Sequence, residues 1–136
     1  LLLRRPYGSP SCFPWAASDV HKGQAAVSDA NLAGADLSLL SDPAEIAVAK
    51  KVAEWPRLVE IAGRTNEPHR VAFYLYELAS ELHSLYHMGK DKPELRFVQE
   101  GNAQATQAKI ALARAVAIVI SAGLGILGVT PAQEMR

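Results

Sequence analysis

One stretch of the sequence, from Pro68 to Gly89, concentrates the side chains that could do chemistry. On a helix, at about 100° per residue, six of its aromatic, histidine and hydroxyl side chains fall on a single face. These side chains are His69, Phe73, Tyr76, Ser80, His83 and His87. Rings and imidazoles of this kind can stack on other rings, form hydrogen bonds or pack against a neighbouring helix. The face therefore admits both a functional and a purely structural interpretation.

Two of these residues, His83 and His87, have the spacing of metal ligands one turn apart on a helix. A zinc site needs more ligands, and the sequence offers no intervening glutamate and no cysteine or carboxylate pair at ligand spacing. We therefore predict no metal site. Patterns of cofactor-binding loops are also missing. Gly123 and Gly125 fall late in a predicted helix and not between a strand and a helix, so they do not form a dinucleotide-binding loop. Cys12 lies in an irregular segment without a base beside it, so the sequence predicts a binding module without catalytic residues.

The helix that must carry the polar face has a regular apolar face on its other side. Its residues are Val71, Leu75, Leu78, Leu82 and Leu85. Steps of three and four residues are typical of a helix that buries one side in a core. Pro68 suits the first helical position and Gly89 suits the residue just past the last turn. We predict a helix from Pro68 to Gly89 with a buried leucine face.

Two shorter helices are predicted before it. The first begins at Pro43, after a capping residue, and runs to about Glu54. Trp55 precedes a proline, which disfavours helical angles, so we expect the chain to bend there. A second short helix follows over Pro56–Ala62, and we expect Gly63 to close it.

The last predicted helix starts after Asn102, which can cap it, and is apolar nearly all round from Ile110 to Leu127. Arg114 is its one charge in that range, and we expect this to be the most buried helix of the bundle. The apolar run is long enough to raise the question of a membrane span, but its glycines, its arginine and the polar turn before it favour a soluble core helix. A capping-box pattern at Thr130–Gln133 predicts one final turn.

The composition fits one domain with a tail. Of the 136 residues, 14 are Lys or Arg and 14 are Asp or Glu, so no overall charge attracts nucleic acid or lipid. We assign residues 1–30 to an irregular N-terminal tail and residues 31–136 to an all-α helical bundle, because no segment alternates as a strand. We expect no DNA and no membrane as partner. A single cysteine suits a reducing compartment, and cytoplasmic localisation is our expectation.

Two long motifs follow one another in the second half of the chain. They are PHRVAFYLYELASELHSLY, which ends at Tyr86, and AKIALARAVAIVISAGLGILGVTPAQEM, which ends at Met135. Together with DLSLLSDPAE and EWPRLVE upstream, they resemble the C-terminal anticodon-binding domain of arginyl-tRNA synthetases. The resemblance covers the chain from about Leu37 to its end. It implies an α-helical bundle of the class I tRNA synthetase anticodon-binding type, with arginine tRNA as its partner.

The resemblance also implies which residues bind. In that family a tyrosine and a C-terminal methionine, here Tyr86 and Met135, help to line a pocket for splayed anticodon bases. Single-stranded loops are read by stacking such bases on aromatic rings and by hydrogen bonds to base edges. Cations near the pocket can hold phosphates. The further predicted tRNA-binding residues are Lys90, Lys92, Tyr76, His83 and Arg136. His69 and Phe73, at the other end of the helix, are expected to pack against a neighbour.

In that family a separate upstream domain activates arginine with ATP. The sequence contains neither its HIGH-like string nor its KMSK-like string. We therefore expect the chain alone to be inactive in charging tRNA. No cofactor is expected for this domain, since ATP and magnesium would belong to the missing catalytic domain, which is the second expected partner.

The sequence departs from the family at several places. An aromatic residue is common where Leu82 stands, an arginine where Lys109 stands, and many members end at the methionine that Arg136 follows here. Residues 1–27 replace a helix of the form Y-x-x-Y-A-x-A-R whose tyrosines complete the pocket. An altered reading frame or an inactive gene remnant would explain that replacement, and the pocket would then be incomplete.

A second interpretation stays open. The chain can be a non-catalytic protein–protein interaction module, in which the face that carries His69, Tyr76 and His83 packs on another helix or on a partner chain. An enzyme with its own chemistry ranks third, because no pair of titratable groups is placed for it.

Overall fold

A computed structural model of the chain describes residue 32 and residues 34–130. Within those residues all regular structure is helical and no strand occurs, which confirms the predicted all-α class. The predicted boundary between tail and bundle stays a prediction, because residues 1–31 lie outside the described part. The elements are η2 (Leu37–Leu39), α3 (Pro43–Ala53), α4 (Trp55–Thr65), α5 (His69–Asp91), η3 (Pro93–Leu95) and α6 (Ala103–Ile126).

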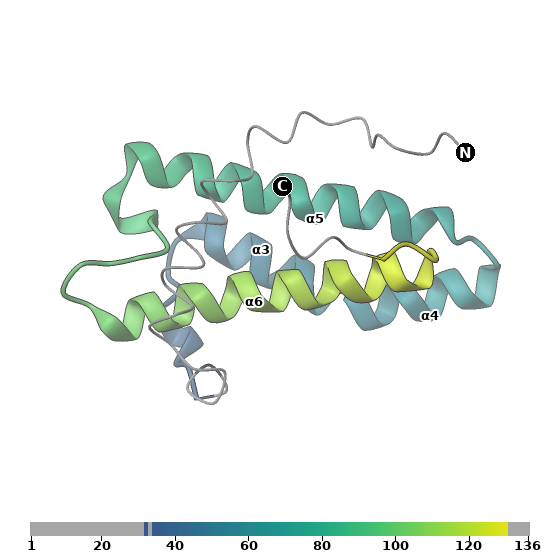
Figure 1. The fold of residues 1–136 in the computed structure, drawn as a ribbon, viewed down its shortest axis with the longest axis horizontal. Helices are drawn as coiled ribbons and strands as arrows, with labels where there is room; N and C mark the ends of the chain where they lie inside the picture. Colours follow the sequence, from purple (N-terminus) through teal and green to yellow (C-terminus); the bar gives the residue numbers. More distant parts are fainter. Residues whose placement is uncertain (1–31, 33, 131–136) are drawn as a thin grey trace.

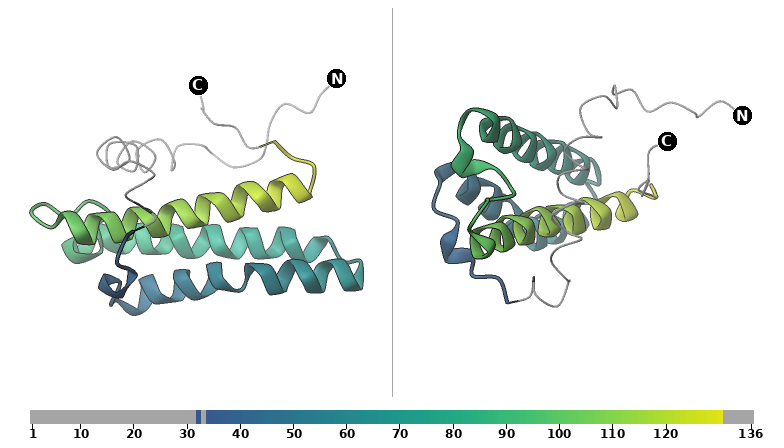
Figure 2. Two further views of the ribbon diagram at one scale, coloured as in Figure 1. Left: turned by 90° about the horizontal axis from the view of Figure 1, so that it is seen from below. Right: turned by 60° about the vertical axis from the view of Figure 1, so that its left-hand side comes forward.

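The helices form a bundle in which α3 and α4 follow one another along one side (Figures 1 and 2). The chain then reverses, so that α5 runs antiparallel to α4 and contacts both α3 and α4. A second reversal through η3 brings α6 back alongside α5 and α3. The C-terminal end of α5 therefore lies at the same end of the bundle as the starts of α3 and α6.

The first helix begins as predicted. Asp42 accepts a hydrogen bond from the Ala44 N–H at 2.8 Å, and the Glu45 side chain accepts one from the Asp42 N–H at 3.4 Å. This reciprocal arrangement is a capping box, with Pro43 in the first helical position. It satisfies backbone donors that have no partner inside the helix, so α3 has a well-defined start.

The second helix differs from the prediction at both ends. Glu54, the one residue between α3 and α4, keeps helical angles (φ −72°, ψ −17°), so Trp55 lies inside α4. A proline in the first turn costs little there, because its missing N–H would have no partner anyway. At the other end Gly63 stays helical, and Asn66 adopts left-handed angles with φ 55°. The predicted bounds Pro56–Ala62 are therefore wrong, since Asn66 and not Gly63 ends the helix.

The third helix confirms the predicted apolar face. Val71, Leu75, Leu78 and Leu85 are buried, and Leu82 is half-buried. The helix continues to Asp91, two residues past its predicted end at Gly89. Gly89 does not end the helix but allows a close contact. A Cβ atom there would lie 3.2 Å from the Leu95 carbonyl oxygen, so the glycine lets the loop after α5 pack closely on the helix.

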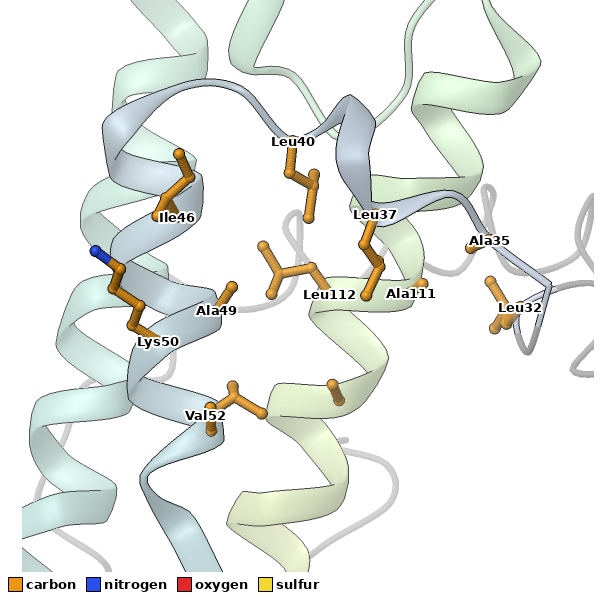
Figure 3. A pocket seen from close by; sticks show the side chains of 12 residues that line it. Leu32, Ala35, Leu37, Leu40, Ile46, Ala49, Lys50, Val52, Ala111 and Leu112 are labelled. Carbon is orange, nitrogen blue, oxygen red and sulfur yellow. The ribbon is translucent and has the colours of Figure 1, made fainter.

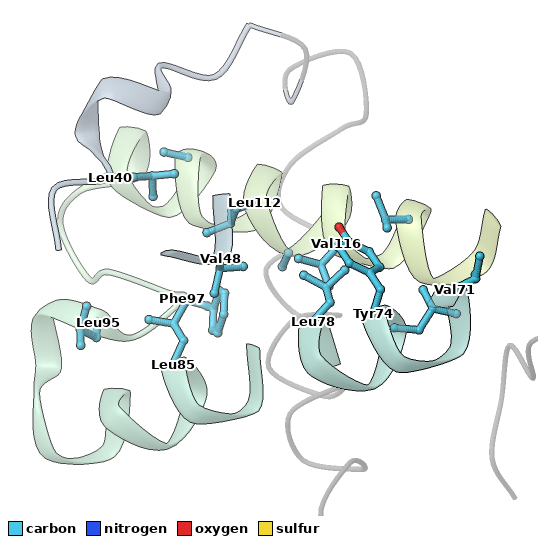
Figure 4. Close-up of a cluster of buried hydrophobic side chains, with 14 of the residues drawn as sticks. Leu40, Val48, Val71, Tyr74, Leu78, Leu85, Leu95, Phe97, Leu112 and Val116 are labelled. Carbon is cyan, nitrogen blue, oxygen red and sulfur yellow. The ribbon is translucent and has the colours of Figure 1, made fainter. Parts of the chain in front are cut away.

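The core packs α5 against α3, α4 and α6, and Figure 4 shows side chains of α3, α5 and α6 that meet in it. Tyr74 is buried in it, stacks on Trp55 with ring centroids 5.6 Å apart, and donates a hydrogen bond to the Lys51 carbonyl. Burial raises the pKa of the Tyr74 phenol to about 12, with smaller contributions from Glu54 and Glu81. The core therefore contains an aromatic group that the leucine pattern did not reveal.

The last helix is only partly covered. Asn102 caps it as predicted, by accepting a hydrogen bond from the Ala105 N–H at 3.0 Å. Its most apolar window has a mean hydropathy of 1.8 but is only 33% buried, and Ile118 and Ile126 are 58% and 52% exposed. Among the described residues, α6 is long and apolar enough to cross a membrane. Core helices of soluble proteins meet the same criteria of length and composition. Its apolar character thus reflects an uncovered face as well as a core face.

Gly123 explains how closely α6 approaches α5. A Cβ atom at this position would lie 2.6 Å from a methyl carbon of Leu75, which is too close for any real contact. Beyond the helix, Gly128 takes left-handed angles (φ 75°), and the Val129 N–H donates to the Leu124 carbonyl at 2.9 Å. This arrangement is a Schellman motif, and it turns the chain back after α6. The capping box predicted at Thr130–Gln133 lies beyond the described residues.

Candidate nucleic-acid interface

Tyr86 lies at the C-terminal end of α5 and is half-buried, so part of its ring remains accessible. Its ring stacks on that of Phe97, with centroids 6.2 Å apart and an interplanar angle of 20°. Phe97 itself is 7% exposed and belongs to the core. Because Phe97 already holds the Tyr86 ring in place, this ring loses little conformational freedom when a base stacks on its other face, which favours base binding.

The loop after α5 holds Phe97 in place. The Gln99 side-chain amide donates to the carbonyls of Pro93, Glu94 and Arg96, at 2.8 to 2.9 Å. The Gln99 N–H in turn donates to the hydroxyl of Thr106 in α6 at 2.9 Å. Sequence reasoning missed both Phe97 and Gln99 as supports of Tyr86. The apolar character of the loop was the only signal for Phe97, and none pointed to Gln99.

Three cations surround this end of α5. Lys90, in the last turn, and Lys92, the C-cap residue, are both exposed. Arg96 is exposed as well, and its Nε donates to the Gly89 carbonyl at 3.2 Å. The predicted residues Lys90 and Lys92 are therefore close in the fold to Tyr86, and Arg96 adds a cation that the sequence patterns did not indicate.

Two histidines lie one turn apart beside Tyr86. The Nε2 atoms of His83 and His87 are 2.8 Å apart, and their ring centroids are separated by 4.3 Å. The His87 ring also makes an edge contact with Tyr86, at 6.3 Å between centroids. The pKa of His87 is lowered, first by desolvation and then by the neighbouring His83 and Lys90. His83 is half-buried and His87 is exposed.

The remaining aromatic residues of α5 lie away from this end. Tyr76 is 75% exposed and precedes Tyr86 by ten residues, which corresponds to about 15 Å along the helix. Phe73 is 66% exposed, and His69 makes a ring-edge contact with it at 6.2 Å. The expectation that Phe73 packs against a neighbour is therefore wrong for the described residues, because no other helix covers its side of α5 there. The structure does not bring Tyr76 to Tyr86.

Two predicted residues, Met135 and Arg136, lie outside the described part of the chain. Their relation to Tyr86 is therefore not tested.

An apolar groove lies elsewhere, between η2, α3 and α6 (Figure 3). Its volume is about 560 Å³, and Leu37, Ile46 and Leu112 are among the side chains that line it. Lys50 is its one charged lining residue, and its amino group points away from Leu112 (Figure 3). The groove has no cluster of cations or aromatic rings, so it lacks the chemistry of the Tyr86 end.

The model of the DALR anticodon binding domain family matches residues 18–135. The chain belongs to this family. DALR domains are anticodon-binding domains, and membership implies that this domain binds tRNA. The match also includes residues 18–30, which the sequence pattern assigned to the tail and which lie outside the described part.

Relatives of this DALR domain are arginine–tRNA ligases. The ligase of Ruegeria sp. (strain TM1040) is 71% identical over 110 residues, which cover 81% of this chain and 19% of the relative. The ligase of Paracoccus denitrificans is 69% identical over 108 residues, covering 79% and 19%. That of Roseobacter denitrificans is 62% identical over 123 residues, covering 88% and 21%. The chain thus spans about one fifth of these relatives. The comparison with solved structures found no match.

Proposed function

We propose that this DALR domain reads the anticodon of arginine tRNA as the C-terminal part of an arginine–tRNA ligase. One observation carries the proposal: at the C-terminal end of α5, the half-buried Tyr86 ring stacks on Phe97 and has exposed cations beside it. A splayed base can stack on such a ring while the cations contact the flanking phosphates. Local contacts of this kind do not require a net positive charge, which suits a chain with equal numbers of acidic and basic residues.

We propose that Met135 also contributes to this pocket, as the family resemblance implies. The residue lies outside the described part of the chain, so this assignment rests on the resemblance alone.

The proposal assigns recognition and not catalysis to this chain. We propose no cofactor for the domain, with ATP and magnesium belonging to the part of the longer ligases that this chain does not span. That part would be its partner in a full-length protein, and arginyl-tRNA formation would require it. A cytoplasmic location follows for a protein of translation and is proposed on that ground.

A direct binding experiment tests the proposal. Labelled arginine tRNA and a tRNA with a different anticodon are titrated into the protein at two salt concentrations. We expect tighter binding of arginine tRNA and a weakening with salt for both, because phosphate contacts release counterions. Equal and weak binding of the two tRNAs would contradict anticodon reading.

Two substitutions locate the site. Tyr86→Ala should cost about 1 to 3 kcal/mol of binding free energy, which is the usual value of one base stacked on an aromatic ring. Tyr86→Phe keeps the ring and should bind nearly as well as the unchanged protein. Phe73→Ala removes an equally aromatic but distant, exposed ring and serves as the matched control. If Phe73→Ala weakens binding as much as Tyr86→Ala does, the pocket lies elsewhere.

The second candidate is a protein–protein interaction module. The observation that favours it is the apolar groove that the exposed Leu37 of η2 helps to line. A polar substitution there, Leu37→Asp, should leave tRNA binding unchanged if the Tyr86 pocket is the functional site. Loss of tRNA binding in Leu37→Asp, with Tyr86→Ala unaffected, would move the function to the groove.

A further inference from the structure

His83 and His87 share one hydrogen bond across their Nε2 atoms, which are 2.8 Å apart. Such a bond needs one nitrogen that carries a proton and one that does not. Two protonated imidazoles would place a hydrogen on each of these nitrogens and a positive charge on each ring. The two rings would then separate, and both N–H groups would be free to donate to another acceptor.

The surroundings of the pair are open and carry charges of both signs. His87 is exposed, Lys90 follows it by one turn, and Tyr86 contacts its ring edge. The charged groups that act on the His87 ring are His83, Lys90 and Asp91, all on α5. The loop packed against this end contributes Glu94 and Arg96, and Arg96 is bonded to the Gly89 carbonyl.

We propose that His83 and His87 form a proton-gated contact for RNA phosphates beside the Tyr86 pocket. In the neutral pair one imidazole donates to the other and neither ring is charged, whereas protonation of both rings breaks this bond and adds two charged donors next to Lys90. The proposal rests on the proposed function of this end of α5 as an RNA-binding site. It adds His87 to the predicted residues and gives the pair a specific role, which is to make RNA affinity depend on pH.

The direction of the pH effect follows from linkage. Desolvation, and then the neighbouring His83 and Lys90, lower the pKa of His87, so its imidazole is neutral at neutral pH in the free protein. A bound phosphate favours the charged imidazole and raises its pKa in the complex. RNA binding then takes up protons, and affinity must rise as the pH falls through the range between the two pKa values. The lower end of that range lies below the ordinary histidine value of about 6.5.

The experiment measures binding of a labelled RNA hairpin with the arginine anticodon loop at pH 5.8 and pH 7.8, at constant salt and with a chelator present. We expect binding to be about tenfold tighter at pH 5.8, as one or two added phosphate contacts would give. The double variant His83→Asn/His87→Asn is compared with its own binding at pH 7.8 and should gain little from the change to pH 5.8. His69→Asn, at the far end of the same helix, is the matched control and should keep the full gain.

Each outcome separates this inference from the proposed function. RNA binding that is selective and depends on Tyr86, but has the same pH response in the double variant, overturns the histidine contact alone. Absence of RNA binding at both pH values overturns the proposed function together with it. Imidazole titration by NMR provides a second measurement: the pKa of His87 should rise on adding the hairpin, whereas the ring resonances of His69 should not shift. Circular dichroism at both pH values checks that all variants are folded.

Discussion

Lys109 of α6 and Glu45 in the first turn of α3 form a buried ion pair. Their side chains are 8% and 4% exposed, and the Lys109 ammonium donates to a Glu45 carboxylate oxygen. The other Glu45 oxygen accepts from the Asp42 N–H, so the pair continues into the capping box of α3. Lys109 therefore connects α6 to α3 inside the protein, although the sequence pattern indicates only a polar turn at this position.

Breaking this pair should destabilise the fold strongly. Lys109→Met leaves the Glu45 carboxylate buried without its partner, which typically costs about 3 to 5 kcal/mol. The double variant Glu45→Leu/Lys109→Met removes both charges and should recover most of that loss. Urea denaturation followed by circular dichroism measures both. Lys109→Arg keeps the charge and is expected to be tolerated, in line with the arginine common at this position in the family. A Lys109→Met protein as stable as the unchanged one would show that the pair contributes little.

The contact between Gly123 and Leu75 predicts opposite effects for two similar substitutions. Gly123→Ala puts a methyl group 2.6 Å from a Leu75 methyl carbon, so the packed leucine must move, at a cost of about 1 to 3 kcal/mol. Gly125→Ala has nothing within 4 Å of its new methyl group and should stabilise the helix by about 1 kcal/mol. The two variants differ by two positions, so their thermal midpoints form a direct comparison. Equal shifts in both would contradict the close approach.

Tyr74 should make the stability of the protein depend on pH in the alkaline range. Its pKa is raised to about 12 by burial, whereas an unfolded tyrosine titrates near 10. The stabilisation is therefore complete below about pH 10 and is lost as the pH rises towards 12. Tyr74→Phe should flatten this fall and should cost about 1 kcal/mol at neutral pH through the lost hydrogen bond to the Lys51 carbonyl. Tyr76→Phe, at a 75% exposed position, is the control and should change neither quantity. Denaturant titrations between pH 7 and pH 12 provide the measurement.

Gln99 should affect RNA binding although it is expected to act only through the loop. Gln99→Ala removes three hydrogen bonds to loop carbonyls and loosens the support that Phe97 gives to Tyr86. We expect RNA affinity to fall about threefold with little change in the salt dependence, since no phosphate contact is lost. Glu100→Ala, at the next and exposed position, is the control. A steeper or shallower salt dependence in Gln99→Ala would indicate that Gln99 contacts RNA itself.

The elements that sequence predicts well are those with local signals. The leucine face of α5 follows from spacing alone, and the start of α3 follows from a proline beside a capping residue. The end of α4 was missed because glycine is the commoner stop signal, whereas the structure uses Asn66 and leaves Gly63 helical. The sequence predicts Gly89 as the end of α5 for a similar reason, but in the structure this glycine allows the backbone of Leu95 to pack closely on the helix.

In the candidate site, too, some residues have a local sequence signal and others have none. Periodicity drew attention to the exposed face of α5, but it did not distinguish Tyr86 from Tyr76, and the family resemblance made that choice. The support behind Tyr86 depends on Phe97, eleven residues later, and on hydrogen bonds that Gln99 makes across the loop. Contacts of this kind exist only once the loop has folded back on the helix, so no local pattern encodes them.

The left-handed turn at Asn66 also has a consequence for how the bundle assembles. Three residues separate α4 from α5, so these helices can meet after closing a very short loop. The pairing of Lys109 with Glu45 joins positions 64 residues apart, and its loop-closure entropy is correspondingly larger. We therefore expect α5 to dock on α4 first in folding, and this pair of helices then provides a surface on which α6 can pack. The attachment of α6 to α3 through the ion pair would be the later step.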